Sequence, residues 1–258
     1  MRWDGEGYHR VATVQEAWGI KLLESIPPGR YQRIVDAGCG SGRMTAHLLR
    51  MFPRSLVVGL DRSEEMLSQA RRVLKRFRRR LKLVHGDLLT AQPGRNFDLI
   101  FSNATLHWVH DHARLFRNLY SWLSAGGRFI AQCGGKGNLR RIEAVMPHLA
   151  DAAPFRAYFR GFRRPVHYGT SAATRQLLER SGFAQIRARL QRAPTRFTSR
   201  AAFKDFLRHV ICVPDLSRLP TAELRECYLE AFLESYEEKF GGQYVLDYVR
   251  LNIQAKRP

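Results

Sequence analysis

RIVDAGCGSG, at residues 33–42, carries the strongest structural signal in the chain. An apolar run, Ile34 and Val35, leads to Asp36, and three glycines alternating with small residues follow. Residues 44–52, MTAHLLRMF, then have the pattern of an amphipathic helix. A buried strand that stops at a glycine loop opening a helix places backbone N–H groups where a nucleotide-like ligand can approach closely.

A second signal lies about 20 residues beyond the loop, at Asp61. This residue ends another apolar run, SLVVGLD, at residues 55–61. An acidic side chain at that spacing can bind both hydroxyls of a ribose. Because glycine loops also serve as plain turns, the loop and the acid together indicate a nucleotide site more strongly than the loop does alone.

Working outward, the first half of the chain alternates apolar runs with helical patterns. Strands are expected at residues 33–38, 56–61, 82–86, 97–103 and 127–133. Helices are expected at residues 43–52, 63–77 and 111–123, with Ser63 and Glu65 placed as helix-start residues. This alternation predicts a parallel sheet with helices on both faces.

Polar side chains end four of the expected strands: Asp36, Asp61, Asp87 and Asn103. Ligands of parallel α/β sheets bind beyond the carboxyl ends of the strands. The four polar residues therefore predict a ligand site at that edge.

The second half of the chain has a different pattern of expected elements. Helices are expected near residues 139–149 and at 170–181, 199–210 and 221–240, and strands at 184–190 and 244–255. We expect one domain over residues 1–258, with its core at about 30–135, 170–192 and 243–256. The rest, about 1–25, 136–169 and 195–242, is expected to form a helical lid over the site. The predicted fold class is α/β, a Rossmann-like, seven-stranded, mostly parallel sheet with an antiparallel last strand and helical lid insertions.

Composition sets further bounds. No apolar run reaches the roughly 18 residues of a membrane span, and the opening MRWDGEGYHR lacks a signal-peptide core. Four cysteines lie far apart without a CxxC pair, which argues against a zinc site or a disulfide framework. A reduced, cytoplasmic protein is therefore expected.

The formal net charge of +20 is the outlier in the composition. It suits an anionic partner: a polycarboxylate, an acidic carrier protein, a nucleic acid or a membrane surface. The alternative is a solvated basic surface. For residues 71–82 we favour that alternative, since Leu74 and Phe77 keep helical spacing and leave the charges on the outer face.

A dehydrogenase and a methyltransferase can share the glycine loop and the acid. The loop is short, and a third polar strand end, HGD at residues 85–87, suits the edge of an adenine ring. A dehydrogenase pyrophosphate favours a longer GxGxxG loop. The spacing thus favours a methyltransferase.

The motifs DAGCGSG at 36–42, GLD at 59–61 with Met66 after it, HGD and FDLIFSNATLHWV at 97–109 resemble those of class I S-adenosylmethionine-dependent methyltransferases. Within that superfamily, WDGEGYHRVATVQ at 3–15 and SNATLHWVHDH at 102–112 look most like trans-aconitate methyltransferases. They are also similar to the carboxyl methyltransferases that act on juvenile hormone acid and plant salicylate. The resemblance implies S-adenosyl-L-methionine as cofactor, and it is strong over the first half of the chain.

The resemblance also implies roles for single residues. Gly38 and Gly40 would admit the methionine part of the cofactor, Asp61 would bind the ribose, and Tyr8 would lie near the sulfonium. The adenine would meet Asp87, covered by Met66 and Leu88. Further residues expected at the cofactor are Asp36, Cys39, Arg62, Asn103 and Ala104. Ordinary packing of an N-terminal helix is the alternative for Tyr8.

Gln15 and Trp108 are the catalytic candidates. In the carboxyl methyltransferases that this chain resembles, a glutamine and a tryptophan at the matching places hold the substrate carboxylate. A carboxylic acid is already ionised at pH 7, so no general base is needed, and catalysis is mostly positioning. A core aromatic under the lid is the alternative for Trp108.

Histidines after the fourth expected strand and arginines of the expected lid are the remaining polar candidates. His107 is expected to pack beside the cofactor rather than act as a base. No metal site is expected at residues 110–112, HDH, because no second ligand group is evident and Asp111 lies at a helix start. The lid arginines are candidates to bind further carboxylates: Arg156, Arg160, Arg163, Arg164 and Arg196.

The predicted function is O-methylation of a carboxylate on a small acid resembling trans-aconitate. The alternatives are a malonyl ester on an acidic carrier protein, another small molecule, or RNA. Against nucleic acid, NATLHW lacks an NPPY-type motif. A cofactor-binding protein without catalysis is the remaining alternative.

Overall fold

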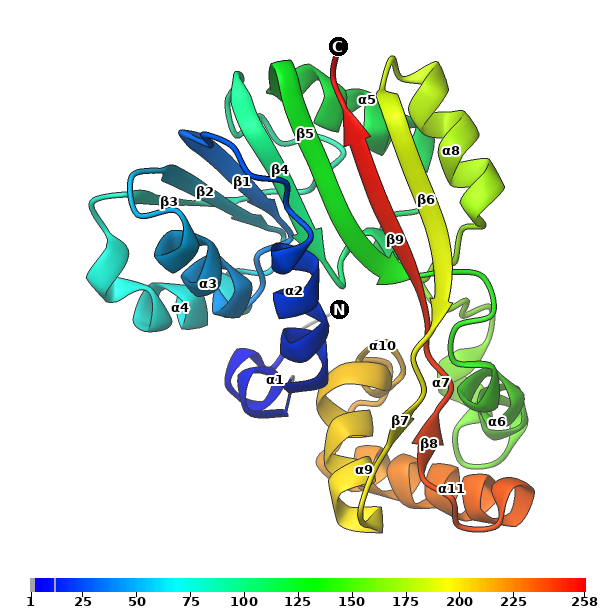
Figure 1. Cartoon of the computed structure of the whole chain (residues 1–258). Helices are drawn as coiled ribbons and strands as arrows, with labels where there is room; N and C mark the ends of the chain where they lie inside the picture. The colour runs from blue at the N-terminus through cyan, green and yellow to red at the C-terminus, as the bar shows by residue number, and fades with distance from the viewer. Residues whose placement is uncertain (1–2, 12) are drawn as a thin grey trace.

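The computed structural model describes residues 3–11 and 13–258. A seven-stranded sheet in the order β3-β2-β1-β4-β5-β9-β6 forms its centre (Figure 1). Parallel pairing joins β3, β2, β1, β4 and β5, and β9 is antiparallel to both its neighbours. The strands are β1 (Arg33–Ala37), β2 (Leu56–Asp61), β3 (Leu81–His85), β4 (Phe97–Asn103), β5 (Leu123–Gly134), β6 (Ala184–Arg192) and β9 (Val249–Lys256). The predicted fold class is confirmed.

Helices cover both faces of the sheet (Figure 1). One face carries α2 (Thr13–Glu24), α3 (Arg43–Met51) and α4 (Glu64–Val73), and the other carries α5 (His112–Trp122) and α8 (Ser171–Arg180). Fully buried leucines, Leu48 and Leu67 on one side and Leu119 and Leu178 on the other, show that each helix turns its apolar face inward.

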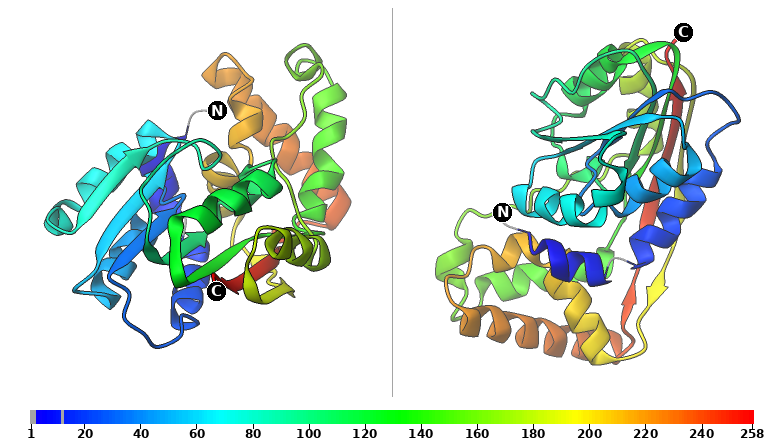
Figure 2. Two further views of the ribbon diagram at one scale, coloured as in Figure 1. Left: turned by 90° about the horizontal axis from the view of Figure 1, so that it is seen from above. Right: turned by 90° about the vertical axis from the view of Figure 1, so that its left-hand side faces the viewer.

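The group of elements expected to form a lid lies beyond the carboxyl ends of the parallel strands (Figure 2). It has its own aromatic core, in which Phe203, Tyr228 and Phe232 are fully buried. Its elements are α1 (Gly5–Val11), α6 (Arg140–Asp151), α7 (Arg156–Phe159), α9 (Arg200–Phe206), α10 (Val213–Leu216), α11 (Ala222–Phe240), β7 (Thr195–Arg196) and β8 (Val245–Leu246). Three short turns complete the chain: η1 (Lys75–Phe77), η2 (Leu106–Trp108) and η3 (Leu207–Ile211).

Several expected boundaries were wrong. The helix expected at residues 63–77 is capped by Ser63, whose hydroxyl accepts from Met66 N–H, but it ends at Val73 and a separate turn follows. The strand expected at 244–255 is interrupted between β8 and β9. There Asp247 bonds the start of α6 instead of a strand, accepting from the N–H groups of Leu139 and Arg141.

The helix expected at 199–210 also divides, into α9 and the π-helical turn η3. Within the described residues, no helix has the length and apolar character needed to cross a membrane.

Candidate functional site

In the glycine loop after β1, a side chain at Gly38 or Gly42 would clash with neighbouring residues. Gly38 has φ +81°, and a Cβ there would lie 2.1 Å from the Thr105 side chain. At Gly42, with φ +82°, a Cβ would lie 2.7 Å from Leu74. At Gly40, with φ +52°, no atom lies within 4 Å of such a Cβ, so the loop leaves open space there.

Asp61, at the end of β2, holds the loop in place. Its Oδ2 accepts from Gly40 N–H at 2.8 Å, and its Oδ1 accepts from Ser63 N–H at 2.9 Å. Burial raises the pKa of this carboxyl, and these backbone bonds oppose the shift. Since each carboxylate oxygen has two lone pairs, acceptor capacity remains for a ligand.

Asp36, near the end of β1, lies deeper in the protein than Asp61. Its Oδ2 accepts from the Thr45 hydroxyl at 2.7 Å, and the residue is 1% exposed. Burial raises its pKa to about 7, with the Thr45 bond opposing. Asp36 therefore links the loop to α3.

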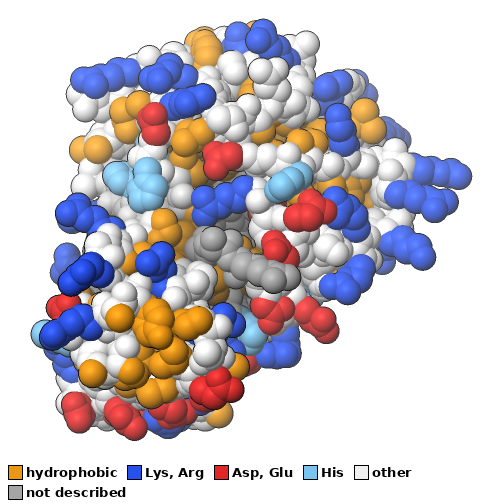
Figure 3. Space-filling model, turned by 180° about the vertical axis from the view of Figure 1, so that it is seen from behind, with side chains coloured by type: hydrophobic (Ala, Val, Ile, Leu, Met, Phe, Trp, Pro, Cys, Tyr) orange, Lys and Arg blue, Asp and Glu red, His pale blue; other side chains and the backbone are white. Residues whose placement is uncertain are grey.

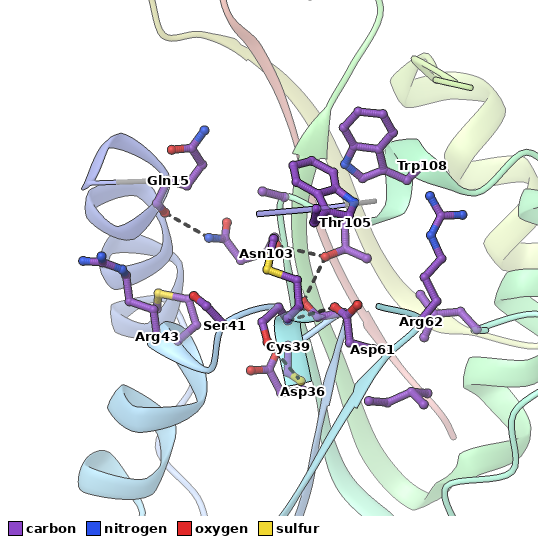
Figure 4. A pocket seen from close by; sticks show the side chains of 18 of the residues that line it. Gln15, Asp36, Cys39, Ser41, Arg43, Asp61, Arg62, Asn103, Thr105 and Trp108 are labelled. Carbon is purple, nitrogen blue, oxygen red and sulfur yellow. Dashed lines mark hydrogen bonds between the residues drawn. The ribbon is translucent and has the colours of Figure 1, made fainter. Parts of the chain in front are cut away.

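A pocket of about 990 Å³ opens above the loop, and Figure 4 shows its walls. All the residues predicted for the cofactor and for catalysis line it: Tyr8, Gln15, Asp36, Gly38, Cys39, Gly40, Asp61, Arg62, Met66, Asp87, Leu88, Asn103, Ala104 and Trp108. Gln15 on α2 and Trp108 in η2 lie on opposite sides of one part of the pocket, and Asp61 lies beyond them (Figure 4). We call this the cofactor pocket.

Two buried side-chain acceptor atoms beside the pocket lack hydrogen-bond partners. Gln15 Oε1 and Asn103 Oδ1 make no hydrogen bond, although Asn103 Nδ2 donates to the Gln15 carbonyl at 2.9 Å. Unsatisfied buried acceptors are costly, so they favour a ligand that supplies donors. With the open loop at Gly40 and the apolar Met66 and Leu88, this lining fits a polar, nucleoside-containing ligand.

The N-terminal segment closes one side of the cofactor pocket. The Trp3 ring packs edge-on against both Tyr8 and Trp108, each at 5.6 Å between ring centroids. Glu16 on α2 pairs with Arg43 and, at 2.8 Å, with His47, both on α3. These contacts fasten α2 to the sheet domain and place Gln15 in the pocket wall.

Sequence reasoning missed several lining residues. Trp3 opens the quoted stretch WDGEGYHRVATVQ, so its position beside Tyr8 was a usable signal. Nothing in the sequence marks Glu16, Arg43 and Thr105 as pocket residues, except that each stands near a predicted residue in the chain.

A second, smaller pocket adjoins the first, with about 500 Å³ of space. It shares Trp3, Tyr8, Gln15, Ala104 and Trp108 with the cofactor pocket. We call it the inner pocket. Its other lining residues are His107, Asn138, Leu139, Arg164, Val166, Tyr168, Val210, Ile211, Tyr248 and Arg250.

His107 lines the inner pocket and is not among the residues that line the cofactor pocket. Its Nδ1 accepts from Gly134 N–H at 3.4 Å, and its ring stacks on Tyr168. Burial, followed by the charge of Arg250, lowers the pKa of His107 to about 3. The ring is therefore neutral and weakly basic at neutral pH.

This pKa predicts a pH-dependent stability. Unfolded His107 binds a proton below pH 6.5 while the folded residue does not until about pH 3, so stability falls as pH falls through that interval. Between pH 7 and about pH 5, the wild type should lose about 2 kcal/mol more unfolding free energy than His107→Gln. Urea unfolding at both pH values measures the difference. Equal pH dependence of the two proteins would contradict it, since Asp36 and the other titrating groups are common to both.

The five predicted lid arginines differ in where their side chains lie. Arg164 lines the inner pocket, where its Nε contacts Asp215 Oδ2 at 3.1 Å. The other four are exposed and lie outside both pockets: Arg156, Arg160, Arg163 and Arg196. Of the five candidates, Arg164 is therefore the one that the structure places at the site.

The HDH motif is engaged in helix capping and packing. Asp111 Oδ1 accepts from Arg114 N–H at the start of α5, and His112 Nε2 bonds the Leu106 carbonyl. The described part of the chain contains no cluster of three or more His, Cys, Asp or Glu side chains able to hold a metal ion.

Residues 34–127 match the model of a methyltransferase domain. The chain is 30% identical to trans-aconitate 2-methyltransferase of Deinococcus radiodurans, over 100% of this chain and 99% of that one. It is also 30% identical to the Acidovorax sp. protein of the same name, over 99% and 98% of the two chains.

Among solved structures, the fold is similar to phosphoethanolamine N-methyltransferase 2 of Haemonchus contortus, in complex with phosphomonomethylethanolamine and S-adenosylhomocysteine, with a TM-score of 0.60 and 17% identity. The match covers 94% of this chain and 52% of that one. At this identity the likeness concerns the fold alone.

Proposed function

Because the chain belongs to the S-adenosylmethionine-dependent methyltransferases, in the family that includes the trans-aconitate 2-methyltransferases, we propose that it methylates a carboxylate oxygen of a small acid. Trans-aconitate is the leading acceptor. The observation that carries this proposal is the full-length similarity to relatives of that name, and the chemistry of the inner pocket supports it.

S-Adenosylmethionine supplies, when bound, a methyl group on a positively charged sulfur. In this proposal the open loop at Gly40 admits the methionine part, Asp61 accepts from the ribose hydroxyls, and Asp87 bonds the adenine amino group. Met66 and Leu88, 4% and 6% exposed, exclude water from the adenine. Tyr8 keeps its proton, since burial raises its pKa to about 12, and its ring and hydroxyl oxygen can stabilise a nearby cation. Asp36, Cys39, Arg62, Asn103 and Ala104 complete the proposed cofactor contacts.

The inner pocket favours an acceptor that arrives already deprotonated. None of its described lining residues is an aspartate, a glutamate or a lysine. His107 has its pKa lowered to about 3 by burial, so it is a poor base. A carboxylic acid with a pKa near 4 is ionised at pH 7 and needs no base, unlike a phenol or an amine.

Gln15 and Trp108 are the proposed positioning pair for the reacting oxygen. Each is uncharged, so each can orient a carboxylate without strongly stabilising its charge in the ground state. Gln15 is 7% exposed and its Oε1 has no partner, so its amide can turn its NH₂ toward an anion. Both residues line both pockets, as groups that align acceptor and donor must.

The test is methyl transfer from labelled S-adenosylmethionine to a panel of acceptors, analysed by mass. The panel holds trans-aconitate, other free acids, a malonyl-carrier thioester and RNA. The expected product is the methyl ester of a free acid, and mild alkali should release its label as methanol.

Label on the carrier protein or on RNA, or an alkali-stable product, would overturn the proposal. Figure 3 shows lysine and arginine side chains scattered over one face of the molecule, with acidic side chains among them. On that face the basic side chains therefore do not form one continuous patch.

A further inference from the structure

Arg250 is the feature of the inner pocket that the proposed reaction leaves unexplained. It lies near the start of β9, paired with Gly134 at the end of β5. Because β9 runs antiparallel to β5, its first residues lie at the same edge of the sheet as the carboxyl ends of the parallel strands. A side chain from β9 thereby reaches the site region.

The Arg250 guanidinium is buried without a counter-ion. The residue is 3% exposed; its Nε donates to Gln132 Oε1 at 3.2 Å, and its guanidinium stacks on the Trp18 ring at 4.6 Å. Its Nη2 has no hydrogen-bond partner. A buried, unpaired charge is among the costliest arrangements in a protein, so binding of an anion at this guanidinium would be strongly favoured.

Arg164, the other arginine of the inner pocket, provides the contrast. Its Nε contacts Asp215, which is 2% exposed, and its Nη2 donates to the Ile211 carbonyl. That cation is compensated within the protein. Among the described residues lining the inner pocket, Arg250 is thus the one cation that lacks an anionic partner.

A second unpartnered group lies beside it. The Tyr248 hydroxyl is buried and makes no hydrogen bond, and Tyr248 also lines the inner pocket. Tyr248 keeps its proton, because burial raises its pKa far above the usual value. A guanidinium N–H and a phenol O–H are two donors, and a carboxylate accepts from both.

We propose that Arg250, with Tyr248, binds a second, non-reacting carboxylate of the acceptor, and so selects acids that carry at least two carboxylates. This inference rests on the proposed carboxyl methylation. Gln15 and Trp108 position the carboxylate that is methylated, and Arg250 holds the one that is not. A strong cation is better placed on the non-reacting group, since on the reacting oxygen it would lower nucleophilicity.

The experiment compares acids that differ by one carboxylate: trans-aconitate and fumarate against crotonate. The wild type should favour the first two. Arg250→Gln should raise KM for trans-aconitate about 100-fold with a smaller change in kcat, and should leave kcat/KM for crotonate within about threefold. Tyr248→Phe, which removes one hydroxyl, should raise the same KM about tenfold. Arg250→Lys should fall between the wild type and Arg250→Gln.

Arg257→Gln is the matched control. Arg257 also stacks on an aromatic ring, Tyr120 at 4.7 Å, and donates to the Tyr120 and Leu123 carbonyls, but it lies outside both pockets. Its loss should leave both KM values unchanged. If Arg250→Gln lowers kcat/KM equally for trans-aconitate and crotonate, Arg250 serves the reacting carboxylate or the fold, and the proposal is overturned.

A binding measurement separates this inference from the proposed function. Calorimetry of trans-aconitate with protein saturated by S-adenosylhomocysteine needs no methyl transfer. Binding that Arg250→Gln weakens about 100-fold and Arg257→Gln does not would support the Arg250 site even if no acid is methylated. Unaltered binding in Arg250→Gln would overturn the site even if trans-aconitate is methylated.

Discussion

Asp61→Asn is expected to weaken S-adenosylmethionine binding on the order of 10³-fold, one of the two largest effects that we expect from a single substitution. The carboxylate is proposed to accept from both ribose hydroxyls while holding the Gly40 and Ser63 N–H groups at 2.8 and 2.9 Å. An amide offers one acceptor oxygen in place of two, so the loop and the ribose compete for it. Calorimetry with S-adenosylmethionine and S-adenosylhomocysteine measures the loss.

Asp98→Asn is the matched control for this prediction. Asp98 Oδ2 also accepts two backbone N–H groups, from Gln32 at 2.7 Å and Arg33 at 2.9 Å. It lies near the start of β4, at the opposite edge of the sheet from the cofactor pocket. Cofactor affinity should remain within about twofold of the wild type in this variant. A similar loss in both variants would show that Asp61 acts through stability and not through the ribose.

The second large effect concerns Gln15 and Trp108. Gln15→Glu places a carboxylate beside the acceptor with little change in shape, and should lower kcat/KM for the acid on the order of 10³-fold through like-charge repulsion. Cofactor affinity should not fall, because the added charge is opposite to that of the sulfonium. Steady-state kinetics measures kcat/KM for the acid, and calorimetry measures the affinity for the cofactor.

Trp108→Phe keeps an aromatic ring against Trp3 and removes the indole N–H. It should lower kcat about 100-fold, since misplacement of the reacting oxygen acts on the chemical step. Trp122→Phe is the control, because Trp122 is 4% exposed and lies outside both pockets. An unchanged kcat in Trp108→Phe would assign Trp108 to core packing.

Most elements of the fold were predictable, because the signals that define them are local. Ser63, Asp111 and Thr170 each accept from an N–H group three residues on, and the helices begin directly after them. One of the boundaries that failed depends on a distant partner. The strand expected at 244–255 breaks where Asp247 bonds residues of α6.

The cofactor side of the candidate site was also readable from the chain. Asp36, Asp61, Asp87 and Asn103 follow strands or end them, and parallel pairing brings those ends to one edge. The residues proposed to bind the methyl acceptor could not be predicted in the same way. The abundance of lid arginines suggested five anion-binding candidates. Only Arg164 lines the cofactor pocket or the inner pocket, and it is already paired with Asp215.

The sequence by itself therefore determined the sheet, the glycine loop and the polar residues at the strand ends beside the cofactor pocket, because each depends on neighbours in the chain and on the rules of parallel pairing. Only the tertiary structure decided which of the two arginines lining the inner pocket is left without a counter-ion. Arg250 contacts Gln132, 118 positions away, and Arg164 contacts Asp215, 51 positions away. Whether a buried charge is compensated depends on which side chains fold against it, and no local pattern records that.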